Sequence, residues 1–306
     1  MFRNLRAFRL LESWPETEDE LAARLATVPF TGCASTASRA AGWESPWPTD
    51  PLNDDQPLLL RSMGADLLQL RIQTRLLPPA AINEALEERV AQFVQRTQRP
   101  PGRAERKELK DAVAAQLLPQ ALLKSDRVRV LCLPKDRLLF VDTATAATAE
   151  LVTERLRDAL GSLPIVPLEF KQPIATWLEQ VFFGRGPVEF QVTRECRMQE
   201  AGDAGANVTW MDIDLQDGSV QRHVKQGLVL ERLGLVFDSE LQFVLDRDGV
   251  IRKLRLVDQA MEDRDVQAEA SAVARLDADL ALWSALIAKL FRALKRQLAG
   301  FAKAGG

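Results

Sequence analysis

Prolines divide residues 78–119 into two helical segments, and this punctuation constrains the fold more than any other feature of the chain. A Pro-Pro pair at 78–79 opens the first segment, whose apolar residues recur at helical spacing over 82–94. Pro-Pro-Gly at 100–102 ends it, and a second helix is expected over about 104–118. The sequence therefore predicts a pair of helices, without the short turn of a helix-turn-helix module that reads DNA sequence.

The rest of the chain mixes strand-like and helix-like patterns without a regular βαβ alternation. Strands are expected over 67–76, 127–133, 137–142, 188–193, 208–214, 228–237, 241–246 and 250–257. Helices are expected over about 17–27, 145–160, 218–226 and 266–299, and a proline-rich loop over 42–57. The first of these helices begins with a capping-box pattern at Thr17. This mixture favours the α+β class.

The chain lacks the motifs of the common enzyme classes. It has a single histidine, His223, and no phosphate-binding loop, dinucleotide fingerprint, nucleophile elbow or HExxH motif. His223 lies in a short polar segment, where an exposed or capping role is expected. Cys33, Cys132 and Cys196 are too far apart in sequence to indicate a zinc site or a disulfide framework. We therefore expect no metal, no cofactor and no enzymatic activity.

Two pairs of acids keep one enzymatic alternative open. Asp212 and Asp214 lie two residues apart on an expected strand, so their side chains would share one face, as a metal-dependent nuclease requires. Asp246 and Asp248 form the second pair, and Asp248-Gly249 is typical of a hairpin turn. No third ligand with recognisable spacing follows either pair, so a structural role is favoured for both.

Charge is distributed unevenly along the chain, although the net charge is only −3. Residues 11–60 contain nine acids and two bases, whereas residues 61–140 contain fifteen bases and nine acids. No apolar run approaches the roughly 20 residues needed to cross a bilayer, and no secretory signal is evident. We expect a cytoplasmic protein with a charge-sorted surface and no membrane contact.

The strongest candidate for function is the basic stretch that straddles the break between the two helices. Non-specific DNA binding needs little more than Lys and Arg side chains that reach phosphates, and the release of condensed counterions drives it. The alternative is a solvated helix face with Glu–Arg and Glu–Lys pairs, and no aromatic residue interleaves to form a stacking platform for single strands. The candidate phosphate contacts are Arg96, Arg99, Arg103, Arg106, Lys107 and Lys110, with Lys124, Arg127 and Arg129 as weaker candidates.

Six apolar residues of the last expected helix step by four, three, four, three and four positions, which is the spacing of an a/d seam. They are Leu276, Leu280, Trp283, Ile287, Leu290 and Leu294. The seam is shorter than the three to four heptads typical of a coiled coil. It would pack on its own domain or pair across a dimer, and the spacing alone does not decide between them.

Several stretches along the whole chain resemble the RdgC family of recombination-associated proteins. Phe30-Thr31-Gly32-Cys33, followed by Gly42-Trp43, is similar to the family's F-T-x-C…G-W signature, and Leu117-Leu118-Pro119 to its L-L-P segment. Further similar stretches are Phe2-Arg3-Asn4-Leu5, Gly161-Ser162-Leu163-Pro164-Ile165-Val166-Pro167-Leu168, Gln242-Phe243-Val244-Leu245 and Leu276-Asp277-Ala278-Asp279. Each motif alone is weak, but their order and spacing together are specific.

The resemblance implies a horseshoe-shaped subunit that pairs into a ring-shaped homodimer, with DNA in a basic central hole. It implies a central domain of residues 1–76 and 119–168, a helical tip of residues 77–118, and a strand-rich base domain of residues 169–306 with a C-terminal dimerisation helix. Leu122 stands where better-known members carry an aromatic residue at the tip contact. Dimer contacts are therefore expected at Leu122 and along the seam.

The function implied by the resemblance is sequence-independent binding of DNA, expected to be duplex DNA of the nucleoid. Such binding would limit the formation of RecA filaments or their access to DNA. Two alternatives from other classes remain: a metal-dependent nuclease that uses Asp212 and Asp214, and a regulator that contacts the recombinase without contacting DNA. Some family members carry basic or amide residues where this chain has Asp212-Ile213-Asp214-Leu215, so we expect no DNA contact at that segment.

Overall fold

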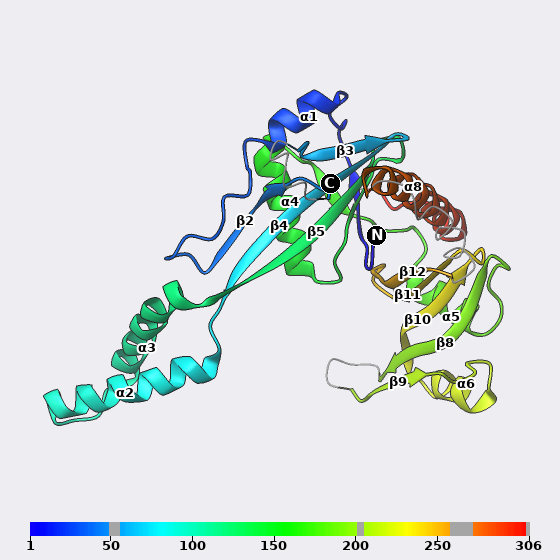
Figure 1. Ribbon diagram of the computed structural model, residues 1–306. Coiled ribbons are helices and arrows are strands. Elements are labelled where there is room, and N and C mark those ends of the chain that lie inside the picture. The colour runs from blue at the N-terminus through cyan, green and yellow to red at the C-terminus, as the bar shows by residue number, and fades with distance from the viewer. Residues whose placement is uncertain (49–55, 201–204, 258–271, 304–306) are drawn as a thin grey trace. The chain divides into compact units, whose positions relative to one another are not determined.

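The computed structural model describes residues 1–48, 56–200, 205–257 and 272–303, and it confirms the α+β class (Figure 1). The chain forms two compact units. The first unit comprises Met1–Thr27, Ser45–Gln69 and Arg129–Gly306, and the second comprises Val28–Glu44 and Leu70–Val128. The three-part division expected from the resemblance remains a prediction. Among the described residues, no helix combines the length and the apolar character that a membrane span requires.

Most helices and strands belong to the first unit. In chain order these are β1 (Arg6–Leu10), α1 (Glu18–Leu25), β3 (Leu59–Ser62), β6 (Leu138–Val141), α4 (Ala146–Leu160), β7 (Ile165–Pro167), α5 (Ile174–Phe182), β8 (Phe190–Gln199), β9 (Asn207–Met211), α6 (Gly218–Lys225), β10 (Val229–Phe237), β11 (Leu241–Asp246), β12 (Ile251–Leu256) and α8 (Ala272–Gln297). The second unit contains β2 (Arg39–Glu44), α2 (Pro79–Thr97) and α3 (Arg103–Leu117), and the long strands β4 (Ala65–Leu76) and β5 (Leu122–Leu133) contribute to both units.

The strands form two sheets. The larger sheet has the order β2-β4-β5-β6-β1-β7, with β3 paired to β4. The smaller sheet has the order β12-β11-β10-β8-β9, and each of its four pairings is antiparallel. An antiparallel sheet commonly packs one face on the core and leaves the other to water, so its strands alternate between apolar and polar residues. The strand β11, Leu-Gln-Phe-Val-Leu-Asp, follows this alternation except at Val244, with Leu241, Phe243 and Leu245 on the core face.

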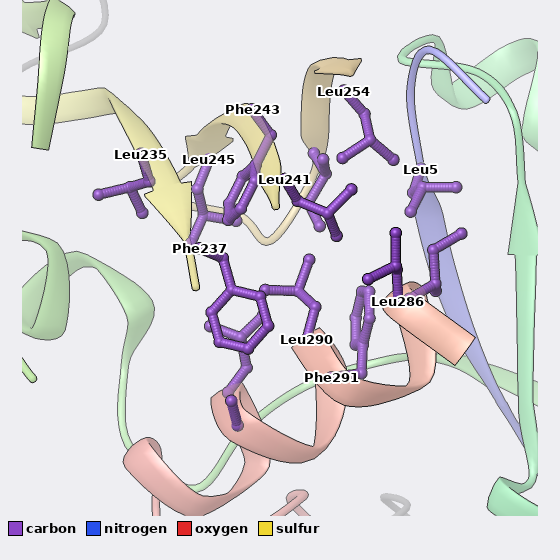
Figure 2. Close-up of a cluster of buried hydrophobic side chains, with 14 of the residues drawn as sticks. Leu5, Leu235, Phe237, Leu241, Phe243, Leu245, Leu254, Leu286, Leu290 and Phe291 are labelled. Atoms are coloured by element: carbon purple, nitrogen blue, oxygen red, sulfur yellow. The ribbon is translucent and has the colours of Figure 1, made fainter. Parts of the chain in front are cut away.

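The helix α8 completes the core of the first unit against the smaller sheet. Figure 2 shows Leu286, Leu290 and Phe291 of this helix directed toward Phe237 and Phe243 of the sheet. All five side chains are buried, and the Phe291 ring lies 4.6 Å from the ring of Phe140 on β6. Burial of each such side chain stabilises the fold by about 2 kcal/mol.

The expected a/d seam is part of this core. All six seam side chains are buried within their own unit, with exposed fractions between 0% and 8%. Trp283 packs edge-on against the ring of Phe2, at 6.1 Å between centroids. Of the two interpretations left open, packing on its own domain is therefore the one that the burial favours. Dimer contact along the seam stays a prediction, since its side chains are covered by the core of their own unit in the single chain.

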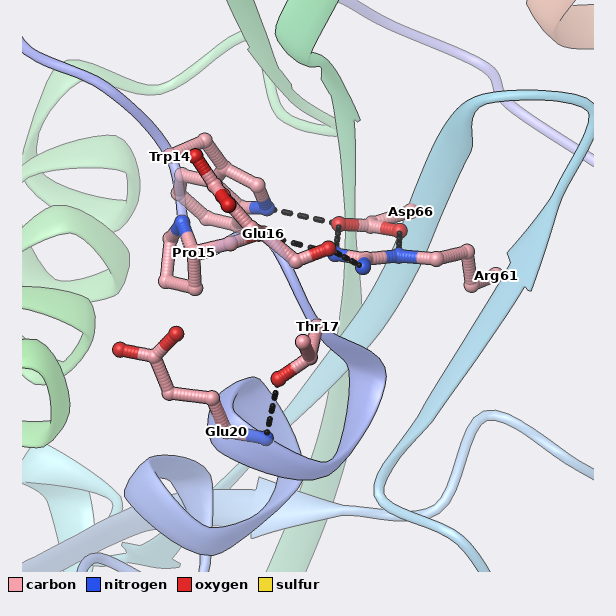
Figure 3. A network of polar contacts seen from close by, with 7 residues as sticks. All are labelled: Trp14, Pro15, Glu16, Thr17, Glu20, Arg61 and Asp66. Atoms are coloured by element: carbon pink, nitrogen blue, oxygen red, sulfur yellow. Dashed lines mark hydrogen bonds and ion pairs between the residues drawn. The ribbon is translucent and has the colours of Figure 1, made fainter.

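A buried polar network fixes the N-terminal segment to the β3–β4 hairpin (Figure 3). Asp66 accepts hydrogen bonds from Trp14 Nε1 (2.6 Å), Arg61 Nε (2.6 Å) and Arg61 Nη2 (2.7 Å). Arg61 also donates to the backbone carbonyls of Pro15 and Glu16. The hydrogen bonds that Arg61 donates to Asp66 raise the pKa of Arg61, so its guanidinium stays charged. The loop that precedes α1 is thus held by charge-assisted hydrogen bonds.

Three expectations about the elements need correction. The expected loop over 42–57 begins later, because β2 continues to Glu44 and Trp43 bonds the backbone of Val28 and Phe30. Gly42 allows this approach, since a Cβ there would overlap the backbone of residues 29–30. The strand expected over 127–133 begins five residues earlier, at Leu122. The helix α5 was not expected, and the part of the last expected helix over 266–271 lies outside the described residues.

Candidate nucleic-acid interface

The expected pair of helices is confirmed: α2 and α3 form a hairpin in the second unit. Leu86 of α2 and Val113 of α3 are the buried side chains of the pair, and Arg89 Nη2 donates to Gln116 Oε1 across it at 2.6 Å. Gln98 adopts the left-handed conformation that ends α2, and its N–H donates to Val94 O. The break at 98–102 is therefore an ordered turn rather than an open linker.

An ion pair closes this turn. Arg99 donates to both carboxylate oxygens of Glu105, at 2.8 Å and 2.6 Å, and the N–H of Gly102 donates to the same carboxylate at 2.8 Å. The Arg99 hydrogen bond, followed by that from Gly102, lowers the pKa of Glu105 to about 2. The Arg99 guanidinium also lies 5.5 Å from the centroid of the Phe93 ring. Arg99 is therefore engaged in the turn, and its phosphate contact stays a prediction.

Four of the predicted bases share one face of α3. Arg106, Lys107 and Lys110 stand three, four and seven residues after Arg103, a spacing that places all four on one side of the helix. All four are exposed, and within the described residues no hydrogen bond or ion pair engages their side chains. We call these four residues the basic face of α3. Arg96, near the end of α2, is also exposed, and within the described residues its side chain makes no hydrogen bond or ion pair.

The position of the basic face is unfavourable for the helix itself. The N-terminal end of a helix carries a partial positive charge, so a base in the first turn costs about 0.3–1 kcal/mol at an exposed site. Arg103 is the first residue of α3, and Arg106 follows one turn later. Helix stability does not account for bases at these positions, whereas a ligand that carries negative charge would.

The weaker candidates are engaged in contacts within the chain. Lys124 forms an ion pair with Asp126 at 2.9 Å, and Arg127 Nε lies 2.6 Å from Glu44 Oε1. Arg71, which we had not singled out, lies 3.5 Å from the other oxygen of Glu44. In the first unit, the side chain of Arg129 donates to the carbonyl of Met1 at 3.0 Å. These contacts reduce the availability of the three candidates for phosphates.

Leu122 is exposed, as a contact residue of a second subunit would be in a single chain. Its exposed fraction is 77%, and the neighbouring Leu123 is 47% exposed. Leu76, at the end of β4, is 45% exposed. Leu122 and Leu123 are successive residues of β5, so their side chains point to opposite faces, and Leu122 is the more exposed of the two.

The nuclease alternative assumed that Asp212 and Asp214 lie on one strand, and this assumption is wrong. The strand β9 ends at Met211, and Asp212 has a φ of 57°, which is not an extended conformation. Asp214 Oδ1 accepts from the N–H of Gln216 in a turn. Within the described residues, no group of three or more His, Cys, Asp or Glu side chains could share a metal ion.

The remaining candidates for chemistry lie in structural settings. Asp246 forms ion pairs with Arg232 and Arg252. Asp248 and Gly249 form the expected hairpin turn, in which the Gly249 N–H donates to Asp246 O. His223 is half-buried rather than fully exposed, with its ring 5.5 Å from that of Trp210.

Comparison with known proteins places these features in context. Residues 1–301 match the family model described as "Putative exonuclease, RdgC". The chain is similar to proteins named "Recombination-associated protein RdgC" from Shewanella halifaxensis (30% identical over 98% of each chain) and Shewanella oneidensis (31% identical, over 98% of this chain and 97% of the relative). It is also 31% identical to the protein of the same name from Pseudomonas aeruginosa, with 98% and 97% covered.

Proposed function

The chain belongs to the RdgC family of recombination-associated proteins, as its motifs predicted, and we propose that it binds DNA without sequence preference and thereby limits RecA filament formation or access. The proposed ligand is duplex DNA, and the proposed active form is a homodimer that encircles it as a ring. The protein would act by occupying DNA in the nucleoid rather than by cutting it. Each of these points goes beyond the family assignment.

One observation carries the DNA-binding proposal: the four side chains of the basic face of α3 are exposed and unpaired within the described residues. Its four side chains extend from consecutive turns of one rigid helix and make no ion pair within the described residues. Lys and Arg side chains that neutralise phosphates release condensed counterions, and this supplies essentially all of non-specific binding. Because phosphates are the same at every base pair, contacts of this kind carry no sequence information.

A salt series tests the proposal. Binding of two unrelated duplexes is measured by fluorescence anisotropy between low and physiological salt. We expect equal affinities for the two sequences and a linear fall of log K with log[salt]. Lys107→Glu should reduce the steepness of that fall by about 0.9 or more, which corresponds to one phosphate contact. The matched control is Lys135→Glu, the same substitution at an exposed position of the first unit.

The outcomes of the salt series separate the alternatives. Absence of binding at low salt would overturn the proposal, and equal slopes for Lys107→Glu and Lys135→Glu would overturn the assignment to α3. The family description includes the word exonuclease, so the same duplexes are end-labelled and incubated with Mg²⁺. Shortening of the labelled strands would favour the nuclease class.

The link to the recombinase needs a separate assay. RecA filament assembly on DNA is followed in the presence of wild-type protein and of a variant in which the basic face of α3 is neutralised to Gln. We expect the wild type to delay assembly and the variant to lose this effect in proportion to its loss of DNA affinity. Inhibition that persists in the variant would favour direct contact with the recombinase.

A further inference from the structure

The face of the smaller sheet opposite the core carries an excess of bases. The five strands β8–β12 contain six bases and three acids, and none of these nine side chains belongs to the apolar core. The bases are Arg194, Arg197, Arg232, Arg252, Lys253 and Arg255, and the acids are Glu195, Glu231 and Asp246. All of these strands lie in the first unit, whereas α3 lies in the second.

Two of these arginines face each other directly. Arg197 on β8 and Arg232 on β10 are partners in the antiparallel register. Like charges placed directly opposite on neighbouring strands destabilise a sheet. On the other side of Arg232, its register partner on β11 is Asp246. Thr209, the partner of Arg197 on β9, carries no charge, so neither register partner of Arg197 carries a counter-charge.

Asp246 holds two of the arginines in place. Its carboxylate is 5% exposed, and it lies 3.1 Å from Arg232 Nε and 2.7 Å from Arg252 Nε. Both contacts use the Nε edge of the guanidinium. Within the described residues, no hydrogen bond occupies the terminal amino groups of either arginine. Two guanidinium groups therefore hold one carboxylate, and their terminal amino groups remain available, while Arg197 stands opposite Arg232 in the register.

Next to this cluster, two side chains from strands that are not neighbours meet across the charged face of the sheet. Lys253 on β12 forms an ion pair with Glu195 on β8 at 2.6 Å, although two strands separate β12 from β8. Three strand spacings on a flat sheet amount to about 14 Å, so the ion pair indicates that the sheet curls toward its charged face. Gly234 lies on β10, between these strands. Its missing Cβ leaves space for the close approach of β8, since a Cβ there would overlap Thr193 Oγ1. The same curl brings the arginines of the neighbouring register row, Arg197 and Arg232, closer together.

We propose that Arg197, Arg232 and Arg252, oriented by Asp246, form a phosphate-binding cluster that contacts the DNA backbone separately from the basic face of α3. A guanidinium offers paired donors that match two phosphate oxygens, and two guanidiniums already fixed by a carboxylate lose little freedom on binding. Arg197 and Arg232 place two positive charges opposite each other, and a phosphodiester beside them would supply the negative charge that offsets their repulsion. This inference rests on the proposed function, because it takes DNA as the source of the phosphate.

The decisive variant is Arg197→Gln, which leaves no carboxylate unpaired. Removal of a like-charge neighbour from Arg232 should leave the melting temperature unchanged or raise it. Removal of a phosphate contact should reduce the steepness of the salt dependence by about 0.9. The matched control is Arg247→Gln on the same sheet, where Arg247 is paired with Glu231 at 2.9 Å, and its slope should equal that of the wild type.

A second variant removes the cluster without stranding a buried charge. The triple change Arg232→Gln, Asp246→Asn and Arg252→Gln replaces each group by a neutral one of similar size. Its slope should fall by about 1.8, for two contacts. Wild-type slopes for both Arg197→Gln and the triple variant, each shown to be folded by its melting transition, would overturn the cluster as a DNA contact.

These results remain separable from those for the proposed function. If Lys107→Glu weakens binding and the cluster variants do not, the proposed function stands and this inference falls. If the cluster variants weaken binding and Lys107→Glu does not, the DNA contact lies on the sheet and not on α3. If the wild-type protein binds no duplex at low salt, both proposals fall together.

Discussion

At the scale of single residues, the partner of each base decides whether it is available to a ligand. Arg99 and Lys107 lie in the same basic stretch, yet Arg99 is held by a bidentate ion pair with Glu105, whereas the Lys107 side chain is exposed without a partner in the described part of the chain. A sequence shows the stretch but not the pairing. The acid responsible, Glu105, stands six residues from Arg99, so no helical spacing rule connects them.

The Arg99–Glu105 ion pair predicts an unusual titration. Because Arg99 and the Gly102 N–H both stabilise the carboxylate, Glu105 should titrate with a pKa of about 2. A depressed carboxyl pKa contributes stability that is complete above the ordinary value near 4.5 and is lost as the pH falls through about 2. NMR titration of the side-chain carboxyl carbon measures this directly. Titration of Glu105 near 4.5 would show that the turn is not closed in solution.

The buried Asp66 predicts a large loss of stability when its partner is removed. Arg61→Ala leaves a carboxylate that is 1% exposed with only Trp14 as a side-chain donor. Breaking a buried ion pair in this way costs about 3 kcal/mol. Chemical denaturation measures the free energy of unfolding. The control is Arg247→Ala, whose more exposed ion pair with Glu231 should contribute about 0.5 kcal/mol; equal losses in the two variants would contradict the assignment.

At the scale of elements, the spacing of apolar residues predicts helices well but does not say what covers them. The seam of α8 is a clear example, because an a/d pattern describes both a coiled-coil interface and a helix packed on a sheet. Its six side chains are covered by their own unit. The choice depends on tertiary packing, which the pattern does not contain.

Truncation of the seam should therefore weaken the fold of the monomer rather than its association. Ile287→Ala removes buried methyl groups from a side chain that is 0% exposed and should lower the free energy of unfolding by about 3 kcal/mol. Leu282→Ala, on the same helix but 37% exposed, should lower it by about 0.5 kcal/mol. Denaturation at two protein concentrations separates the effects. A loss for Ile287→Ala that vanishes at high concentration would place the side chain in an intersubunit contact.

The elements that were missed differ in whether the sequence carried a signal. The helix α5 buries Ile174, Trp177, Leu178, Val181 and Phe182, a spacing typical of an amphipathic helix. That signal was present. The early end of β9 carried only a weak signal: in Val-Thr-Trp-Met-Asp-Ile-Asp the alternation changes phase at Trp210-Met211, and the strand ends there, with Asp212 at positive φ. The nuclease hypothesis depended on that single conformation.

At the scale of the whole molecule, the family could be predicted from the order of motifs, while the binding surfaces could not. Arg197 and Arg232 lie 35 positions apart in sequence and Arg232 and Arg252 lie 20 apart, and only the strand register brings Arg197 opposite Arg232 and Arg252 beside Asp246. By contrast, the basic face of α3 is contained in eight consecutive residues. Local surfaces can be predicted from spacing, and surfaces assembled across strands require the sheet order.

The proposed homodimer predicts that a single charge on the second unit disrupts association. Leu122 and Leu123 are adjacent and exposed, so an aspartate at Leu122 would place an unpaired charge in an apolar contact. Leu122→Asp should weaken dimerisation at least about tenfold, equivalent to about 1.4 kcal/mol, with an unchanged melting temperature of the monomer. Sedimentation velocity over a concentration series measures this. Val188→Asp is the matched control, because Val188 is 93% exposed in the first unit.

A ring held closed at this contact should also slide from linear duplex but remain on circular duplex, and Leu122→Asp should remove that difference. Equal dimerisation of the two variants would exclude Leu122 from the contact, and the dimer would then have to form through another surface.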